Sequence, residues 1–107
     1  MLLTKALSKN NVTIRLTSER WHHIVIAHQE IRDDDFPKIM KVISEPDFIL
    51  KGNKGEYLAV KRITGKENWL VVPYKEVSQE DGFVLTAYFS SNLIWLLKKE
   101  IIWNKQS

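Results

Sequence analysis

The first half of the chain has one short strand pattern followed by two helical patterns. Residues 12–16 alternate β-branched and polar positions, which predicts a strand. After it, Thr17 or Ser18 is a suitable N-cap, and apolar positions recur at helical spacing from Trp21 to Ile31, with His28 among them. We therefore expect a helix that carries His28 in line with its buried stripe. A second helix is predicted over 34–44, where a Glu-Pro pair ends it.

The second half of the chain changes to the two-residue period of strands. Four strands are predicted, over residues 47–51, 56–63, 68–77 and 82–89. Short turns at 52–55, 65–66 and 79–82 separate them and make neighbouring strands antiparallel. Because Pro73 cannot donate a ladder hydrogen bond, we expect a bulge or an edge position there. A short helix is predicted over 91–99, with Ser90 and Ser91 as its cap.

This order of elements predicts the fold class. Helices followed by strands indicate an α+β fold in which N-terminal helices pack on one face of a four-stranded, or slightly larger, antiparallel sheet. In the last strand, alternation places Val84, Thr86 and Tyr88 on one face and the intervening apolar residues on the other. The face with Thr86 and Tyr88 is then free for chemistry.

Length and composition favour one folded domain. The 107 residues show no change of composition, and 44% are hydrophobic and 27% charged, close to the average of globular proteins. We interpret 1–107 as a single domain with a loosely held lead-in or short helix at 1–11, a core at 12–95 and a C-terminal extension at 96–107. Within the extension, Ile101, Ile102 and Trp103 either dock on the domain or contact a partner.

Three further properties narrow the class of function. The chain has no cysteine, which removes disulfides and thiolate chemistry. No apolar run approaches the roughly 20 residues of a membrane helix, and the start does not resemble a secretory signal, so we expect a cytoplasmic protein with no membrane partner. The formal net charge of +3 is compatible with a polyanionic ligand.

Three segments carry a resemblance to a known family. The helix RWHHIVIAH at 20–28, EPDFIL at 45–50 and GFVLTAYF at 82–89 resemble, in order and spacing, the phage-associated branch of the barnase, EndoU, colicin and RelE ribonuclease superfamily. The resemblance covers residues 12–95. The chain departs from the family where His28 is followed by Gln29-Glu30 instead of proline and glutamate.

The resemblance implies a function and partners. It implies a RelE-like fold and an endoribonuclease that cleaves RNA, with tRNA and mRNA as candidates, by attack of the ribose 2′-hydroxyl on the adjacent phosphate. It also implies that no metal or cofactor takes part. Members are typically toxins held in check by a cognate antitoxin or immunity protein.

Such cleavage needs a proton acceptor, a proton donor and groups that stabilise charge on phosphorus. His28 is the first candidate acid or base, because histidine titrates near neutral pH. The alternative is a core histidine bonded to a backbone carbonyl. His23 is a reserve candidate whose alternative is an exposed surface position. A metal site is not expected, since no histidine pair has i, i+4 spacing and Asp33–Asp35 are typical of a solvated helix start.

The strands supply the other candidates. Arg62, or its neighbour Lys61 on the other face, can present a cation to phosphate, although strand ends often carry such residues for solubility. Thr86 can orient the phosphate, and Tyr88 can stack on a base or donate a proton, although both suit a strand for β propensity alone. Ser90 can contact RNA as well as cap a helix.

A second class of function remains open. The same fold can serve as a non-catalytic RNA- or protein-binding module, such as a phage-related accessory domain, in which His28 is structural. Trp95 and Trp103 lie near the end of the chain and are free to anchor an antitoxin or a dimer partner. The sequence does not decide the oligomeric state.

Overall fold

The computed structural model describes residues 1–63 and 68–105, in which strands outnumber helices. The elements in chain order are β1 (Leu2–Leu7), β2 (Thr13–Thr17), α1 (Ser18–Ala27), α2 (Phe36–Ser44), β3 (Phe48–Lys51), β4 (Tyr57–Arg62), β5 (Trp69–Glu76), β6 (Asp81–Val84), β7 (Tyr88–Ser90), α3 (Leu93–Leu96) and β8 (Ile101–Asn104). The expected turn at 65–66 lies outside the described residues.

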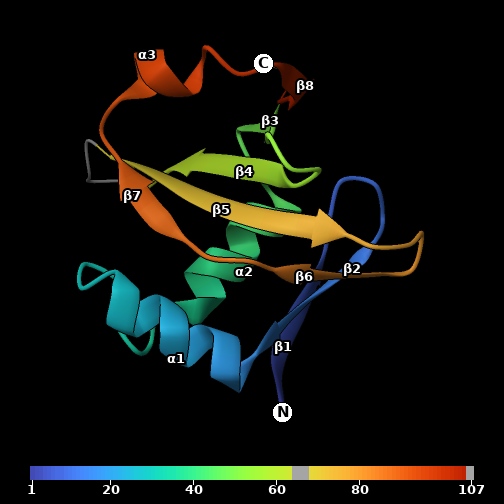
Figure 1. Ribbon diagram of the computed structural model, residues 1–107, viewed down its shortest axis with the longest axis vertical. Coiled ribbons are helices and arrows are strands. Elements are labelled where there is room, and N and C mark those ends of the chain that lie inside the picture. Colours follow the sequence, from blue (N-terminus) through green and yellow to red (C-terminus); the bar gives the residue numbers. More distant parts are fainter. Residues whose placement is uncertain (64–67, 106–107) are drawn as a thin grey trace.

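The strands form one mixed sheet (Figure 1). Its order is β1-β2-β6-β5-β4-β3-β8, and β7 pairs with β5 beyond the end of β6. The pairing of β2 with β6 is parallel, and the other described pairs are antiparallel. The prediction of a four-stranded antiparallel sheet in a RelE-like arrangement is therefore wrong, because eight strands share this sheet.

The sheet has a hydrophobic core on each face. On one face, α1 and α2 pack on the sheet and form a buried cluster that we call the first core. Its side chains include Ile24, Ile43 and Val72. The second core lies on the opposite face and contains Phe48, Leu50, Leu58, Val60, Val71 and Leu96 of α3. Adjacent strand residues alternate between the two cores, as Val71 and Val72 do. The prediction that helices cover only one face is consequently wrong.

The two N-terminal helices were predicted correctly. The Thr17 hydroxyl accepts a hydrogen bond from the backbone N–H of Arg20 at 3.1 Å, which confirms Thr17 as the N-cap of α1. Helix α2 ends at Ser44, two residues before Pro46. Helix α3 is shorter than the predicted 91–99, and its N-cap is Asn92 rather than Ser90 or Ser91.

Both ends of the described chain are strands. Residues 1–11 are not a loose lead-in or a helix, because β1 pairs with β2 from Leu2 to Leu7. At the other end, β8 pairs with β3 and places Trp103 opposite Ile49, so this segment docks on the domain. In Figure 1, β1 and β8 lie at opposite margins of the sheet.

The predicted strand over 82–89 is interrupted by a bulge. Val84 pairs with Tyr74 and Tyr88 with Val71, so three residues, 85–87, stand opposite the two residues 72 and 73. Pro73 explains the interruption. Its carbonyl accepts the N–H of Leu85 at 2.9 Å, but it has no N–H to return the bond.

The bulge changes which residues share a face. Val84 and Ala87 both belong to the first core, whereas Tyr88 packs against the second. The predicted common face of Val84, Thr86 and Tyr88 is therefore wrong. One extra residue in the strand shifts the alternation between Val84 and Tyr88.

Candidate functional site

His28 lies where α1 ends, and its backbone is held on both sides. Its N–H donates to the carbonyl of Ile24 at 3.0 Å, which closes the helix, and its carbonyl accepts the N–H of Ile31 at 2.9 Å. Ile31 is almost fully buried in the first core. The helix end and this buried anchor together fix the position from which the imidazole projects.

The bulge brings Thr86 to His28. The Thr86 Oγ1 atom lies 3.5 Å from Nε2 of the imidazole, although 58 positions separate the two residues in sequence. The His28 side chain is 29% exposed, so its ring is not enclosed in the core. In Figure 1, α1 lies below the segment that leads from β6 to β7, and it ends on the side where β7 lies. The imidazole is accordingly accessible and faces a hydroxyl.

Tyr88 completes a cluster of three polar side chains, which we call the His28 cluster: His28, Thr86 and Tyr88. The ring centroids of His28 and Tyr88 are 6.1 Å apart, and the ring planes are tilted by 33°. Burial raises the pKa of the half-buried Tyr88 phenol, and the negative charge of Glu56 raises this pKa further. The phenol therefore stays protonated at neutral pH and is a donor rather than a base.

Glu30 lies on the other side of the imidazole. Its Oε1 atom is 4.0 Å from Nδ1 of His28, which places the ring between a carboxylate and the Thr86 hydroxyl. A carboxylate near Nδ1 favours the tautomer that carries a proton on Nδ1 and leaves Nε2 free to accept one. Sequence reasoning treated Gln29-Glu30 only as a departure from the family and missed this role.

Glu56 was also missed, and the turn between β3 and β4 is built around it. Its carboxylate accepts the backbone N–H of Lys54 at 2.8 Å, and this bond lowers the pKa of Glu56. A Cβ atom on Gly52 would overlap the Glu56 side chain where it now lies, so a larger residue there would displace the carboxylate that Lys54 holds. Gly55 has φ 85°, which favours glycine in the same turn. The two glycines around Glu56 were the only signal in the sequence.

Arg62 lies on the same face as Tyr88 but not beside it. Its guanidinium stands over the Trp69 ring, 6.0 Å from the centroid. Val60, Val71 and Tyr88 are aligned across β4, β5 and β7, and Arg62 lies two residues farther along β4. The strand spacings put its Cα roughly 12 Å from that of Tyr88. Arg62 is not part of the His28 cluster.

The three remaining candidates lie apart from the cluster. Lys61 Nζ donates to the carbonyl of Glu45 at 2.9 Å, beside a pocket that Lys9 and Trp103 also line. His23 is exposed on α1. The Ser90 hydroxyl accepts the N–H of Asn92 at 3.3 Å and so holds the turn before α3.

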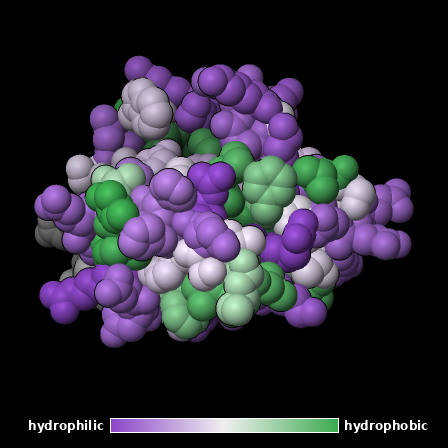
Figure 2. Space-filling view, turned by 60° about the horizontal axis from the view of Figure 1, so that its bottom comes forward, coloured by the Kyte–Doolittle hydropathy of each residue, from purple (hydrophilic) through white to green (hydrophobic). Residues whose placement is uncertain are grey.

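The surface on the α1 side has a mixed character. Figure 2 shows hydrophobic side chains in separate groups among hydrophilic ones, without one continuous hydrophobic patch on the side in view. Within residues 1–63 and 68–105, no group of three or more histidine, aspartate or glutamate side chains is arranged to hold a metal ion. No helix in the described ranges has the length and hydropathy needed to cross a bilayer.

The cluster is suited to proton transfer. It joins an imidazole that can accept a proton, a phenol that stays protonated and a hydroxyl that can orient a ligand oxygen. Comparison of the chain with protein-family models, with curated proteins and with solved structures found no match. The geometry of the His28 cluster is therefore the observation from which function is argued.

Proposed function

We propose that the chain is a metal-independent endoribonuclease in which His28, Thr86 and Tyr88 act on one phosphodiester. The observation that carries the proposal is the 3.5 Å approach of the Thr86 hydroxyl to the exposed imidazole of His28, with the Tyr88 ring alongside. Residues from a helix end, a bulge and a strand converge there. A purely structural histidine needs no such second and third polar partner.

The proposed reaction balances within the RNA and these side chains. The 2′ oxygen forms a bond to phosphorus while the bond from phosphorus to the 5′ oxygen breaks, which leaves a 2′,3′-cyclic phosphate. His28 Nε2 accepts the 2′ proton, and the Tyr88 phenol donates a proton to the departing 5′ oxygen. Thr86 holds a phosphate oxygen between them.

The surroundings of each group support these roles. The raised pKa of Tyr88 means that the phenol is protonated at neutral pH and has a proton to donate. Glu30, whose Oε1 atom lies 4.0 Å from Nδ1, flanks the ring on its Nδ1 side and can help to orient it. Arg62 is assigned to a neighbouring phosphate, because it lies farther along the same face and can bind two phosphate oxygens at once.

The biological role proposed with this chemistry is that of a toxin. Uncontrolled RNA cleavage arrests growth, so the protein requires a cognate antitoxin or immunity protein and acts in the cytoplasm. The net charge of +3 supports an RNA substrate without identifying it.

The direct test compares His28→Ala with His23→Ala. Both variants remove an imidazole from the region of α1. His23 is the control because it is exposed on the helix and lies outside the His28 cluster. Loss of a positioned acid or base lowers a rate by typically 10²- to 10⁴-fold. We therefore expect His28→Ala to lose RNA cleavage and growth arrest by at least about 100-fold and His23→Ala to keep both.

Cleavage is measured on total cellular RNA in the presence of a chelator, with the cyclic phosphate end identified by mass spectrometry. Equal cleavage by the two variants would remove His28 from the mechanism. Activity abolished by the chelator would overturn the metal-independent reaction. RNA binding without cleavage by the unmodified protein would favour the non-catalytic module instead.

A further inference from the structure

A cleft lined by lysines opens on the sheet face that carries the second core. It encloses about 460 Å³ between the β3–β4 turn and the segment from α3 to β8. The residues that line it include Asn53, Trp95, Lys98 and Lys99, and we call it the lysine cleft. With Lys51 and Glu100 counted, its charged lining is three cations and one anion. The cleft thus favours an anionic ligand.

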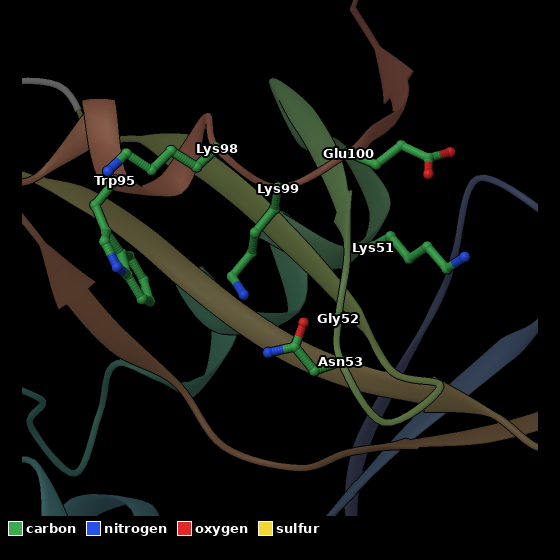
Figure 3. A pocket seen from close by; sticks show the side chains of 7 residues that line it. All are labelled: Lys51, Gly52, Asn53, Trp95, Lys98, Lys99 and Glu100. Carbon is green, nitrogen blue, oxygen red and sulfur yellow. The ribbon is translucent and has the colours of Figure 1, made fainter.

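Trp95 and Lys99 form the inner wall of this cleft. In Figure 3, both side chains extend from the α3 side across the strands below, and Asn53 rises toward them from the β3–β4 turn. Trp95 is 50% exposed, and the Lys99 ammonium lies 5.3 Å from its ring centroid. The Trp95 ring is thus half in solvent beside a cation, so a flat anionic ligand can both stack on the ring and pair with the ammonium.

The lysine cleft and Tyr88 of the His28 cluster lie on the same sheet face. Leu96 of α3 is buried in the second core, and Leu93 and Tyr88 pack against the same core, so α3 and Tyr88 share one sheet face. Glu56, in the turn opposite α3, is the electrostatic bridge. The charge of Lys99 lowers the pKa of Glu56, and the charge of Glu56 raises the pKa of Tyr88. A strand of RNA that reaches Tyr88 can therefore extend into the cleft.

We propose that the lysine cleft binds single-stranded RNA next to the cleaved bond, with one unpaired base stacked on Trp95 and a backbone phosphate on Lys99. This assignment rests on the proposed ribonuclease function and names its substrate as single-stranded. Only an unpaired base presents its face to a side chain, since the faces of paired bases are stacked within the duplex. Asn53, opposite, offers both a donor and an acceptor to the edge of that base.

The test measures binding apart from cleavage. The probe is a fluorescent single-stranded RNA of about ten nucleotides whose 2′-hydroxyls are methylated, so that it binds but cannot react. Trp95→Ala is compared with Trp95→Phe, which keeps an aromatic face. Lys99→Gln is compared with Lys41→Gln, which removes the same charge from an exposed position on α2. Anisotropy gives affinity, and circular dichroism verifies folding.

We expect Trp95→Ala to weaken binding at least about fivefold, and Trp95→Phe to recover most of the loss. In a plot of the logarithm of the binding constant against the logarithm of the salt concentration, Lys99→Gln makes the slope shallower by about 0.7. Lys41→Gln leaves this slope unchanged. With unmodified RNA, the two cleft variants raise KM and leave kcat unchanged, whereas His28→Ala lowers kcat.

Two results would overturn the assignment. One is equal affinity of Trp95→Ala and the unmodified protein for the methylated RNA. That result would indicate that the exposed residues of α3 bind a protein partner instead of RNA. The other is equally tight, Trp95-dependent binding of duplex RNA. Failure of the unmodified protein to cleave, combined with binding that both cleft variants lose, would overturn only the proposed function and support the cleft as an RNA site.

Discussion

At the scale of single residues, the ionisation of Tyr88 depends on its neighbours. Burial is the larger cause of its raised pKa, and the charge of Glu56 is the second. The Glu56 carboxylate is itself held by the backbone N–H of Lys54 at 2.8 Å. The turn between β3 and β4 therefore acts on the chemistry of a residue in β7.

Neutralising this carboxylate should make Tyr88 more acidic. A nearby negative charge disfavours tyrosinate, so we expect Glu56→Gln to lower the pKa of Tyr88 while burial keeps it above the ordinary value. The ultraviolet absorbance of tyrosinate gives the titration, and Tyr88→Phe identifies the signal. Any loss of cleavage at alkaline pH that follows Tyr88 then moves to lower pH.

A matched change at Glu80, which is exposed in the turn between β5 and β6, should leave the titration unaltered. A Tyr88 signal at the same pH in Glu56→Gln and the unmodified protein would contradict the electrostatic link. The acid limb of the activity profile provides a further check, because Glu56→Gln should not move it.

At the scale of elements, the position of β6 between β2 and β5 depends on Gly82. Gly82 is opposite Ile14 of β2 and Glu76 of β5, within the plane of the sheet. A Cβ atom at this position would meet the Lys75 carbonyl oxygen and lie 2.7 Å from Cδ1 of Ile14. The first contact is with backbone, which cannot rotate away as a side chain does.

We therefore expect Gly82→Ala to lower the free energy of unfolding by about 1–3 kcal/mol, the usual cost of overpacking. Urea denaturation followed by circular dichroism measures it. The control is Gln79→Ala in the adjacent turn, which is exposed and should change the free energy by less than about 0.5 kcal/mol. Equal stability of the two variants would show that β6 moves away from β5 at little cost.

The elements that the sequence predicts well are those with strong local signals. Helix α1 has both a periodic apolar stripe and the Thr17 cap, and α2 has a proline that limits it. β1 was missed because its partner, β2, lies across a turn that lacks a strong glycine signal, and its residues are largely exposed or half-buried. β8 was missed because its pairing with β3 spans half of the chain.

The candidate site divides in the same way. His28 and Tyr88 were chosen from the pattern and the resemblance, but the contact of Thr86 with His28 depends on the bulge at 85–87. Pro73 signalled an irregularity, although simple alternation gave the wrong faces for this strand. Glu56 was not predicted, because its effect on the pKa of Tyr88 arises only when the turn between β3 and β4 comes near β7.

At the scale of the whole molecule, the first and last strands form the margins of the sheet. β8 covers one side of β3, and Trp103 lies half-buried opposite Ile49. Without β8, the backbone groups of β3 that now pair with it would meet solvent. An unpaired strand edge with apolar residues promotes association between molecules.

Removing residues 101–107 should therefore lower the free energy of unfolding by at least about 2 kcal/mol, the value of burying one large apolar side chain. The shortened chain should also self-associate through β3. Chemical denaturation and light scattering measure the two effects. Ile102→Ala, which trims an exposed side chain but keeps the strand, should show neither, and a stable monomeric truncation would mean that β3 does not need its outer partner.

The pKa of Glu56 is lowered mainly by its bond to the Lys54 N–H and further by the charge of Lys99, and the charge of Glu56 raises the pKa of Tyr88. If the proposed RNA binds at Lys99, occupancy of the cleft and ionisation of the phenol become linked equilibria. A polyanion that draws Lys99 away leaves the carboxylate less compensated, and the pKa of Tyr88 rises further. Thermodynamic reciprocity then requires that ionising Tyr88 weaken that polyanion by the same factor. In the proposed mechanism, bound RNA would thus help to keep protonated the phenol that donates the proton.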